Sequence, residues 1–327
     1  MITPLLLALG LVMLLLGGTI LVRGASEIAY RYGVSPLIVG LTIVAFGTSA
    51  PELAVNIYGP LQGATDLAFG NVVGSNISNM GLVLGAAALL TPITIQGQVV
   101  RREVPLLLLA ITVVTVMALD VPLDGREAFI SRSEAIVLML LFLIFVYVNV
   151  LDFTQARRPD SLFADIEHTP LVKTEPRSRV SWILVVAGIM LLVLGGDMTV
   201  QHGSALALRF GVSETVIGLF IVAVGTSLPE LATSVIAAVR RESDLALGNV
   251  VGSCIFNSLV VLPASAMISN IPIPQLGIGD LVLSWFLAAI LIPVFIFRKA
   301  TMGRRTGFFL VVIYVGYAMA RILGDTA

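Results

Sequence analysis

The feature that most constrains this chain is the recurrence of long apolar stretches. Ten segments of about 20 mostly apolar residues, the length that crosses a bilayer core, alternate with short polar breaks. They lie at 4–22, 34–58, 67–90, 104–119, 133–150, 180–200, 212–238, 245–268, 281–297 and 306–323. Only 12% of the 327 residues are charged, whereas a soluble domain carries about 25%. The sequence therefore predicts an all-α integral membrane protein with ten transmembrane helices.

The basic residues indicate how these helices are oriented. Lys and Arg in short loops stay on the cytoplasmic side of a membrane. Of the 19 basic residues, 15 lie in the loops after spans 1, 3, 5, 7 and 9, and the exceptions are Arg126, Arg132, Arg209 and Arg321. We therefore expect a multi-pass protein of the plasma (inner) membrane with both termini outside. The longest loop, 151–179, is expected to be a solvated cytoplasmic linker.

The sequence repeats itself with an offset of 178 residues. VGLTIVAFGTSAPELAV at 39–55 matches IGLFIVAVGTSLPELAT at 217–233, and GNVVGSNISN at 70–79 matches GNVVGSCIFN at 248–257. Residues 1–150 and 180–327 thus form two repeats of five predicted helices. Because five is odd, the second repeat begins on the opposite side of the membrane, and the two are predicted to be inverted. Inverted repeats are typical of secondary transporters, which bind substrate at the midplane, and they also occur in some channels.

Two glutamates occupy equivalent positions inside apolar spans. Glu52 and Glu230 are 178 residues apart, and no Lys or Arg lies inside spans 2, 3, 7 or 8 to pair with them. An ionised carboxylate at the bilayer centre costs about 2.5–3.5 kcal/mol. A proton or a bound cation must therefore offset this cost. Because the same glutamate recurs in both repeats, a cation or proton site is favoured over a purely structural role.

Proline and hydroxyl residues precede each glutamate. Pro51 and Pro229 each remove one helical hydrogen bond, so that backbone carbonyl oxygens become available in the preceding turn. Hydroxyls stand three and four positions before each glutamate on the same helix face, and they belong to Thr48, Ser49, Thr226 and Ser227. Ca²⁺ takes six to eight oxygen ligands, and Na⁺ also seeks oxygen. These groups together predict an oxygen cage for a cation.

The second motif places a serine and an asparagine on one helix face in each repeat, four positions apart. They are Ser75, Asn79, Ser253 and Asn257. Buried amides need polar partners, so we expect these side chains to form a polar wall opposite the glutamates, while the glycines of the motif serve helix packing. Asn71 and Asn249 lie near the entrances of spans 3 and 8. For these two residues, helix capping or loop bracing is as open as ligand contact.

The two motif pairs resemble the alpha-repeats of the cation/calcium exchanger superfamily, specifically its prokaryotic sodium/calcium exchangers. The resemblance covers essentially the whole chain. It implies an antiporter in which Na⁺ and Ca²⁺ compete for overlapping sites between spans 2, 3, 7 and 8, while spans 1 and 6 slide to switch access. It suggests Glu52 and Glu230 as shared ligands, with carbonyl oxygens of Thr48 and Thr226 at a central Ca²⁺. It also suggests one Na⁺ site formed by Ser49, Glu52 and Ser253 and another formed by Ser227, Glu230 and Ser75, with help from the carbonyl oxygens of Ala45 and Ala223.

One departure from the family pattern concerns the charge of the site. Some prokaryotic members carry Asp at one wall position, where this chain has Asn79 and Asn257. Two glutamates leave the site with two negative charges, which one Ca²⁺ would neutralise. Exchange of several Na⁺ for one Ca²⁺ would then be electrogenic. The expected function is therefore Ca²⁺ extrusion driven by the inward Na⁺ gradient.

Other functions are open or disfavoured on the sequence. H⁺ or K⁺ as the coupling ion is an alternative, and a cation channel is a further one. We expect no enzymatic activity, because the spans contain no HExxH string and no nucleophile–base pair. The expected substrates are Na⁺ and Ca²⁺, in a protein that lies in the lipid bilayer. No cofactor, nucleic acid or obligate protein partner is expected.

Overall fold

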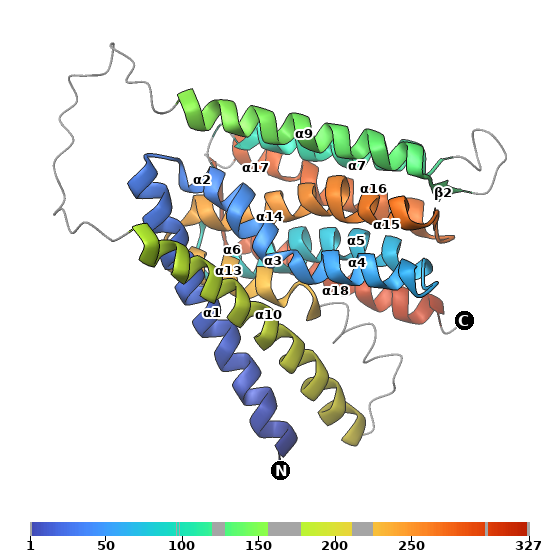
Figure 1. The fold of residues 1–327 in the computed structure, drawn as a ribbon, viewed down its shortest axis with the longest axis horizontal. Helices are drawn as coiled ribbons and strands as arrows, with labels where there is room; N and C mark the ends of the chain where they lie inside the picture. Colours follow the sequence, from blue (N-terminus) through green and yellow to red (C-terminus); the bar gives the residue numbers. More distant parts are fainter. Residues whose placement is uncertain are drawn as a thin grey trace.

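A computed structural model describes the chain over residues 2–95, 97, 99–119, 128–155, 178–210, 225–297 and 300–325. These residues form a bundle of helices, several of which contain a π-helical turn, labelled η (Figure 1). The first repeat contains α1 (Ile2–Tyr32), α2 (Pro36–Val39), η1 (Gly40–Val44), α3 (Ala45–Thr48), α4 (Ala50–Leu61), α5 (Asp66–Ser78), η2 (Asn79–Val83), α6 (Leu84–Leu90), η3 (Val99–Glu103), α7 (Val104–Met117) and α9 (Arg132–Gln155).

The described part of the second repeat follows the same order. It contains α10 (Ser178–Arg209), α13 (Leu228–Val239), α14 (Ser243–Phe256), η5 (Asn257–Val261), α15 (Leu262–Ile268), α16 (Gly277–Ala289), α17 (Leu291–Phe297) and α18 (Arg304–Asp325). Its strands and those of the first repeat are two residues long: β1 (Ile93–Thr94), β2 (Phe129–Ile130), β3 (Ile271–Pro272) and β4 (Thr301–Met302).

Six described helical segments are long and apolar enough to cross a membrane, and a seventh is broken. The six are Thr3–Tyr32, Leu67–Leu90, Arg132–Leu151, Arg179–Leu206, Ser243–Ile268 and Gly277–Val294. The broken one joins Pro36–Thr48 to Ala50–Leu61 with a bend of 43°. Each of these seven segments coincides with a predicted span, and described helices also occupy parts of the other three predicted spans. Because the start of predicted span 7 lies outside the described residues, the count of ten stays a prediction.

Burial separates central helices from peripheral ones. In their most apolar 18-residue stretches, 94% of Ser243–Ile268 and 78% of Leu67–Leu90 is buried, against 22% of Arg132–Leu151. The exposed side chains of the peripheral helices are largely apolar, as they must be to face lipid. The two central helices carry the GNVVGS motifs. The polar residues of the second motif therefore lie in the interior of the bundle.

The helices α1 and α10 run side by side, obliquely to the rest of the bundle (Figure 1). Gly10 approaches Gly195 while Gly17 approaches Gly188, so that the two helices are antiparallel. A Cβ on Gly17 would stand 2.9 Å from the carbonyl oxygen of Gly188, which is closer than real Cβ contacts. Glycine is thus required for this approach. Predicted spans 1 and 6 are neighbours, and their sliding stays a prediction.

Two pairs of strands connect loops of opposite repeats. β1 pairs antiparallel with β4, with Ile93 opposite Met302, and β2 pairs antiparallel with β3, with Ile130 opposite Ile271. β1 and β4 follow predicted spans 3 and 9, whereas β2 and β3 follow predicted spans 4 and 8. Each pair therefore joins loops that the sequence assigns to the same side of the membrane.

Candidate cation site

Each of the two glutamates lies in the first turn of a helix that begins after a break. α3 ends at Thr48 and α4 begins at Ala50, while α13 begins at Leu228. Proline is tolerated in a first turn, because its missing N–H would have no helical partner there. Glu52 and Glu230 are both fully buried. The prolines thus set the start of the helices that bring the carboxyl groups into the interior.

The serines at these breaks do not cap their own helices. A serine three residues before a glutamate, as in Ser49 and Glu52, commonly forms a reciprocal capping box. Neither Ser49 nor Ser227 makes a side-chain capping bond. Instead, Ser49 Oγ donates a hydrogen bond of 2.8 Å to Glu230 Oε1 in the other repeat. Ser253 Oγ donates a longer one, of 3.4 Å, to the same oxygen.

The surroundings of Glu52 are reciprocal to those of Glu230. Its carboxyl group interacts electrostatically with that of Glu230 and with the hydroxyls of Ser75 and Thr226. Thr226 comes from the second repeat, as Ser49 beside Glu230 comes from the first. Among the described residues, however, neither carboxyl oxygen of Glu52 has a hydrogen-bond partner. Each glutamate therefore lies beside a hydroxyl group of the other repeat, but within the described chain only Glu230 accepts hydrogen bonds from such side chains.

Several buried polar atoms at this centre lack a hydrogen-bond partner within the described parts of the chain. They are both carboxyl oxygens of Glu52, Glu230 Oε2, the hydroxyls of Thr226 and Ser227, and the side-chain oxygens and nitrogens of Asn79 and Asn257. An unpaired buried polar group costs about 1–3 kcal/mol, and more if it is charged. Most of these atoms are oxygen acceptors, and three of them are carboxyl oxygens of the two glutamates. The set therefore suits a hard cation such as Na⁺ or Ca²⁺.

The four predicted wall residues lie on the two central helices. Ser75, Asn79, Ser253 and Asn257 are all buried. Asn79 and Asn257 each begin a π-helical turn, in which the N–H groups of Leu84 and Leu262 reach back to their carbonyl oxygens. π-helical turns inside α-helices are frequent at functional sites. The sequence did not predict these turns, because no local residue pattern marks them.

Asn71 and Asn249 each bond to a side chain of the neighbouring helix in their own repeat, which is a role that the sequence did not suggest for them. Asn249 Nδ2 donates to Ser234 Oγ at 2.9 Å, and Asn71 Nδ2 donates to Asn56 Oδ1 at 2.5 Å. Asn56 and Ser234 are buried and 178 residues apart. Sequence reasoning missed both, although each is a polar residue four positions after a glutamate of the site. That spacing was the available signal.

Of the two alanines whose carbonyl oxygens are predicted ligands, the structure describes only Ala45. Ala45 is buried at the start of α3, and its carbonyl oxygen already accepts the N–H of Ser49 at 3.0 Å and the hydroxyl of Thr48 at 3.3 Å. It would have to give up one of these bonds, or share its oxygen, in order to bind Na⁺. Ala223 lies outside the described residues.

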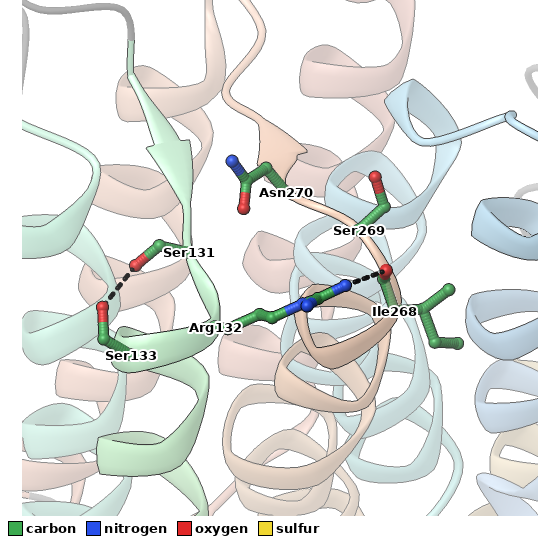
Figure 2. Close-up of a pocket in the computed structure, with 6 residues that line it drawn as sticks. All are labelled: Ser131, Arg132, Ser133, Ile268, Ser269 and Asn270. Carbon is green, nitrogen blue, oxygen red and sulfur yellow. Dashed lines mark hydrogen bonds between the residues drawn. The ribbon is translucent and has the colours of Figure 1, made fainter.

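A separate polar pocket of about 540 Å³ lies at the start of α9 (Figure 2). It is lined by Ser131, Arg132, Ser133, Ile268, Ser269 and Asn270. Arg132 donates to the carbonyl oxygen of Ile268 at 3.1 Å, and Ser131 bonds to Ser133 and caps the helix together with Glu134. None of the predicted site residues lines this pocket. It is therefore not part of the candidate cation site.

Comparison with known proteins relates the whole chain to ion exchangers. The family model described as sodium/calcium exchanger protein matches residues 2–151 and 180–323. The inner membrane protein YrbG of Escherichia coli is 34% identical over 97% of this chain and 98% of its own length. The sodium/calcium exchanger MaX1 of Methanosarcina acetivorans is 32% identical over 96% of each. A solved structure of the sodium-calcium exchanger NCX_Mj matches with a TM-score of 0.81 at 28% identity, over 97% of both chains.

Proposed function

Because this chain belongs to the sodium/calcium exchanger protein family, we propose that it is an antiporter that extrudes Ca²⁺ in exchange for Na⁺. Members of the family are membrane ion exchangers. The single observation that carries the finer assignment is the pair of fully buried carboxyl groups, Glu52 and Glu230, in a cluster of polar atoms that lack protein partners. Inside a membrane, such a cluster favours the binding of a cation, which would supply the missing partners.

The charge of the cluster supports a competition between one Ca²⁺ and several Na⁺. Two glutamates neutralise one Ca²⁺, whereas three Na⁺ would leave one positive charge, so that exchange would be electrogenic. Both ions would share Glu52 and Glu230. The remaining proposed ligands are the carbonyl oxygens of Thr48, Thr226, Ala45 and Ala223 and the side chains of Ser49, Ser227, Ser75, Ser253, Asn79 and Asn257.

The proposed architecture is ten helices in two inverted repeats, 1–150 and 180–327, joined by a cytoplasmic loop at 151–179. The strand pairs support it, since each joins loops that the basic residues assign to one side. The contacts of the two glutamates also support it, because each glutamate lies beside a hydroxyl group that the other repeat supplies. Both termini would then lie outside the cell.

Alternating access would expose this site to one side at a time. The α1–α10 pair, which packs through glycines along its length, is the proposed moving element. Its smooth glycine contacts would let one helix pass the other with few side chains to rearrange. H⁺ coupling is a second candidate, because Glu52 has no hydrogen-bond partner within the described chain and could take up a proton in place of a cation.

The deciding experiment is Ca²⁺ uptake into Na⁺-loaded proteoliposomes that contain the purified protein. We expect radioactive Ca²⁺ to accumulate only with an outward Na⁺ gradient, and to do so faster when the membrane potential favours the movement of net positive charge outward. Li⁺, K⁺ and H⁺ gradients replace Na⁺ in turn. Equal uptake with a proton gradient alone would reject Na⁺ coupling. Uptake that needs no counter-ion would identify a channel.

A further inference from the structure

One hydrogen bond ties the helix break of the first repeat to the second repeat. Thr48 Oγ1 donates to Asn249 Oδ1 at 3.1 Å, between α3 and α14. The amide nitrogen of the same Asn249 donates to Ser234 Oγ at 2.9 Å and approaches the carbonyl oxygen of Glu230 at 3.5 Å. Asn249 is fully buried. A single carboxamide therefore links Thr48, which stands four residues before Glu52, with the helix that carries Glu230.

The equivalent bond in the other half of the site is absent. Asn71 is the repeat equivalent of Asn249, and its amide nitrogen makes the equivalent bond within the repeat, to Asn56. Thr226 is the equivalent of Thr48, yet its Oγ1 is buried beside the carboxyl group of Glu52 and makes no hydrogen bond to Asn71 or to any other described residue. The asparagine therefore bonds to the neighbouring helix of its own repeat in both halves. The bond from a threonine to the asparagine of the other repeat is present only between Thr48 and Asn249, although both halves contain the residues that could make it.

We propose that Asn249 and Asn71 are positioning residues for transport, and that the Thr48–Asn249 and Thr226–Asn71 bonds form alternately in the two access states. The proposal rests on the proposed antiport function. In the described state, the Thr48–Asn249 bond is formed and the Thr226–Asn71 bond is not. In the opposite state, the two repeats would exchange conformations, so that Thr226 bonds to Asn71 and Thr48 is released.

The chemistry of the threonine hydroxyl suits such an exchange. In the described state the hydroxyl of Thr48 lies within reach of two acceptors, Asn249 Oδ1 at 3.1 Å and the carbonyl oxygen of Ala45 in its own helix at 3.3 Å, so that on release from Asn249 it can bond to the carbonyl oxygen alone. Thr48 therefore has an acceptor in either state, whereas the hydroxyl of Thr226, which is released in the described state, lies beside the carboxyl group of Glu52. Because one bond is lost as its equivalent forms, the two states stay close in free energy, and the bound ion decides between them.

The proposal predicts effects of opposite sign for two equivalent substitutions. Thr48→Val removes the bond of the described state and keeps the side-chain shape, so that the population shifts toward the opposite state. Thr226→Val does the reverse. One neutral hydrogen bond changes such a ratio about threefold to tenfold. The apparent Ca²⁺ affinity follows the populated fraction of each state, so the ratio of half-saturating Ca²⁺ on the two membrane faces should move up in one variant and down in the other.

The test measures Ca²⁺ uptake in intact cells and in everted vesicles, for the unchanged protein, Thr48→Val and Thr226→Val. Thr42→Val is the matched control, because the hydroxyl of Thr42 bonds to the carbonyl oxygen of Ile38 in its own helix and to no other residue of the described chain. The ratio for this variant should equal that of the unchanged protein. Shifts in the same direction, or no shift, would overturn the proposal. If Thr48→Val does not fold, Asn249→Ala replaces it, with Ser234→Ala as its control.

A second readout separates this proposal from the proposed function. Hydrogen–deuterium exchange of the cation-free protein reports opening near α14 and near α5 without any transport. Thr48→Val should raise exchange around Asn249 and lower it around Asn71, and Thr226→Val should do the opposite. Parallel changes in both regions would reject the alternation even if Na⁺-driven Ca²⁺ flux is observed. Opposite changes in a protein without such flux would reject the proposed function alone.

Discussion

Replacing either site glutamate by glutamine should abolish Ca²⁺ exchange without unfolding the protein. Glu52→Gln and Glu230→Gln keep the shape of the side chain and remove one of the two negative charges. Both positions are fully buried, and no basic side chain lies in the spans around them. A buried charge that lacks a partner destabilises the fold. We therefore expect the cation-free variants to melt no earlier than the unchanged protein.

The size of the effect follows from the charge left in the membrane. With one glutamate, a bound Ca²⁺ retains one uncompensated positive charge. An uncompensated charge at the bilayer centre costs at least about 2.5 kcal/mol on the insertion scale. Since each 1.4 kcal/mol is a factor of ten, the Ca²⁺ affinity should fall by at least about 60-fold. Calorimetric Ca²⁺ titration and Ca²⁺ flux in Na⁺-loaded proteoliposomes measure this loss.

Glu103 supplies a matched control for these variants. It is also a fully buried glutamate near the start of a helix, but it forms an ion pair with Arg102 at 2.9 Å and is not one of the proposed ligands. Glu103→Gln should therefore leave the Ca²⁺ affinity unchanged. Robust Na⁺-driven flux in Glu52→Gln or Glu230→Gln would refute the reasoning. So would an equal loss of affinity in Glu103→Gln.

The remaining predictions concern orientation and helix packing. In a Cys254→Ala background, a cysteine at Gln62 should react with an impermeant thiol reagent from outside the cell, and one at Arg240 only from the cytoplasm; labelling of both from one side would contradict the inverted repeats. Gly17→Ala should destabilise the protein by about 1–3 kcal/mol, because the added Cβ meets Gly188 at 2.9 Å. Gly316→Ala, where a Cβ meets nothing within 4 Å, should be neutral or slightly stabilising. Equal changes in melting temperature for both would contradict the close α1–α10 contact.

Much of the helical architecture could be predicted because it depends on local composition. An apolar stretch of membrane length forms a helix whatever its neighbours are, since its backbone groups must bond to each other in lipid. The seven described segments that meet the length and hydropathy criteria coincide with predicted spans for this reason. Glu52 and Glu230 were predicted on equally local grounds, as carboxyls that recur at one offset without a basic partner.

The tertiary structure alone decided how the polar side chains pair. The local pattern of Ser49 and Glu52 favours a capping box, yet Ser49 bonds to Glu230, because the fold brings the two helix breaks together and the buried carboxyl accepts a stronger bond. The π-helical turns at Asn79 and Asn257 and the Thr48–Asn249 bond also depend on contacts between segments far apart in the chain. Sequence periodicity carries no information on such contacts. The sequence determined which polar residues the central helices contain, and packing determined which of them lack a hydrogen-bond partner among the described residues.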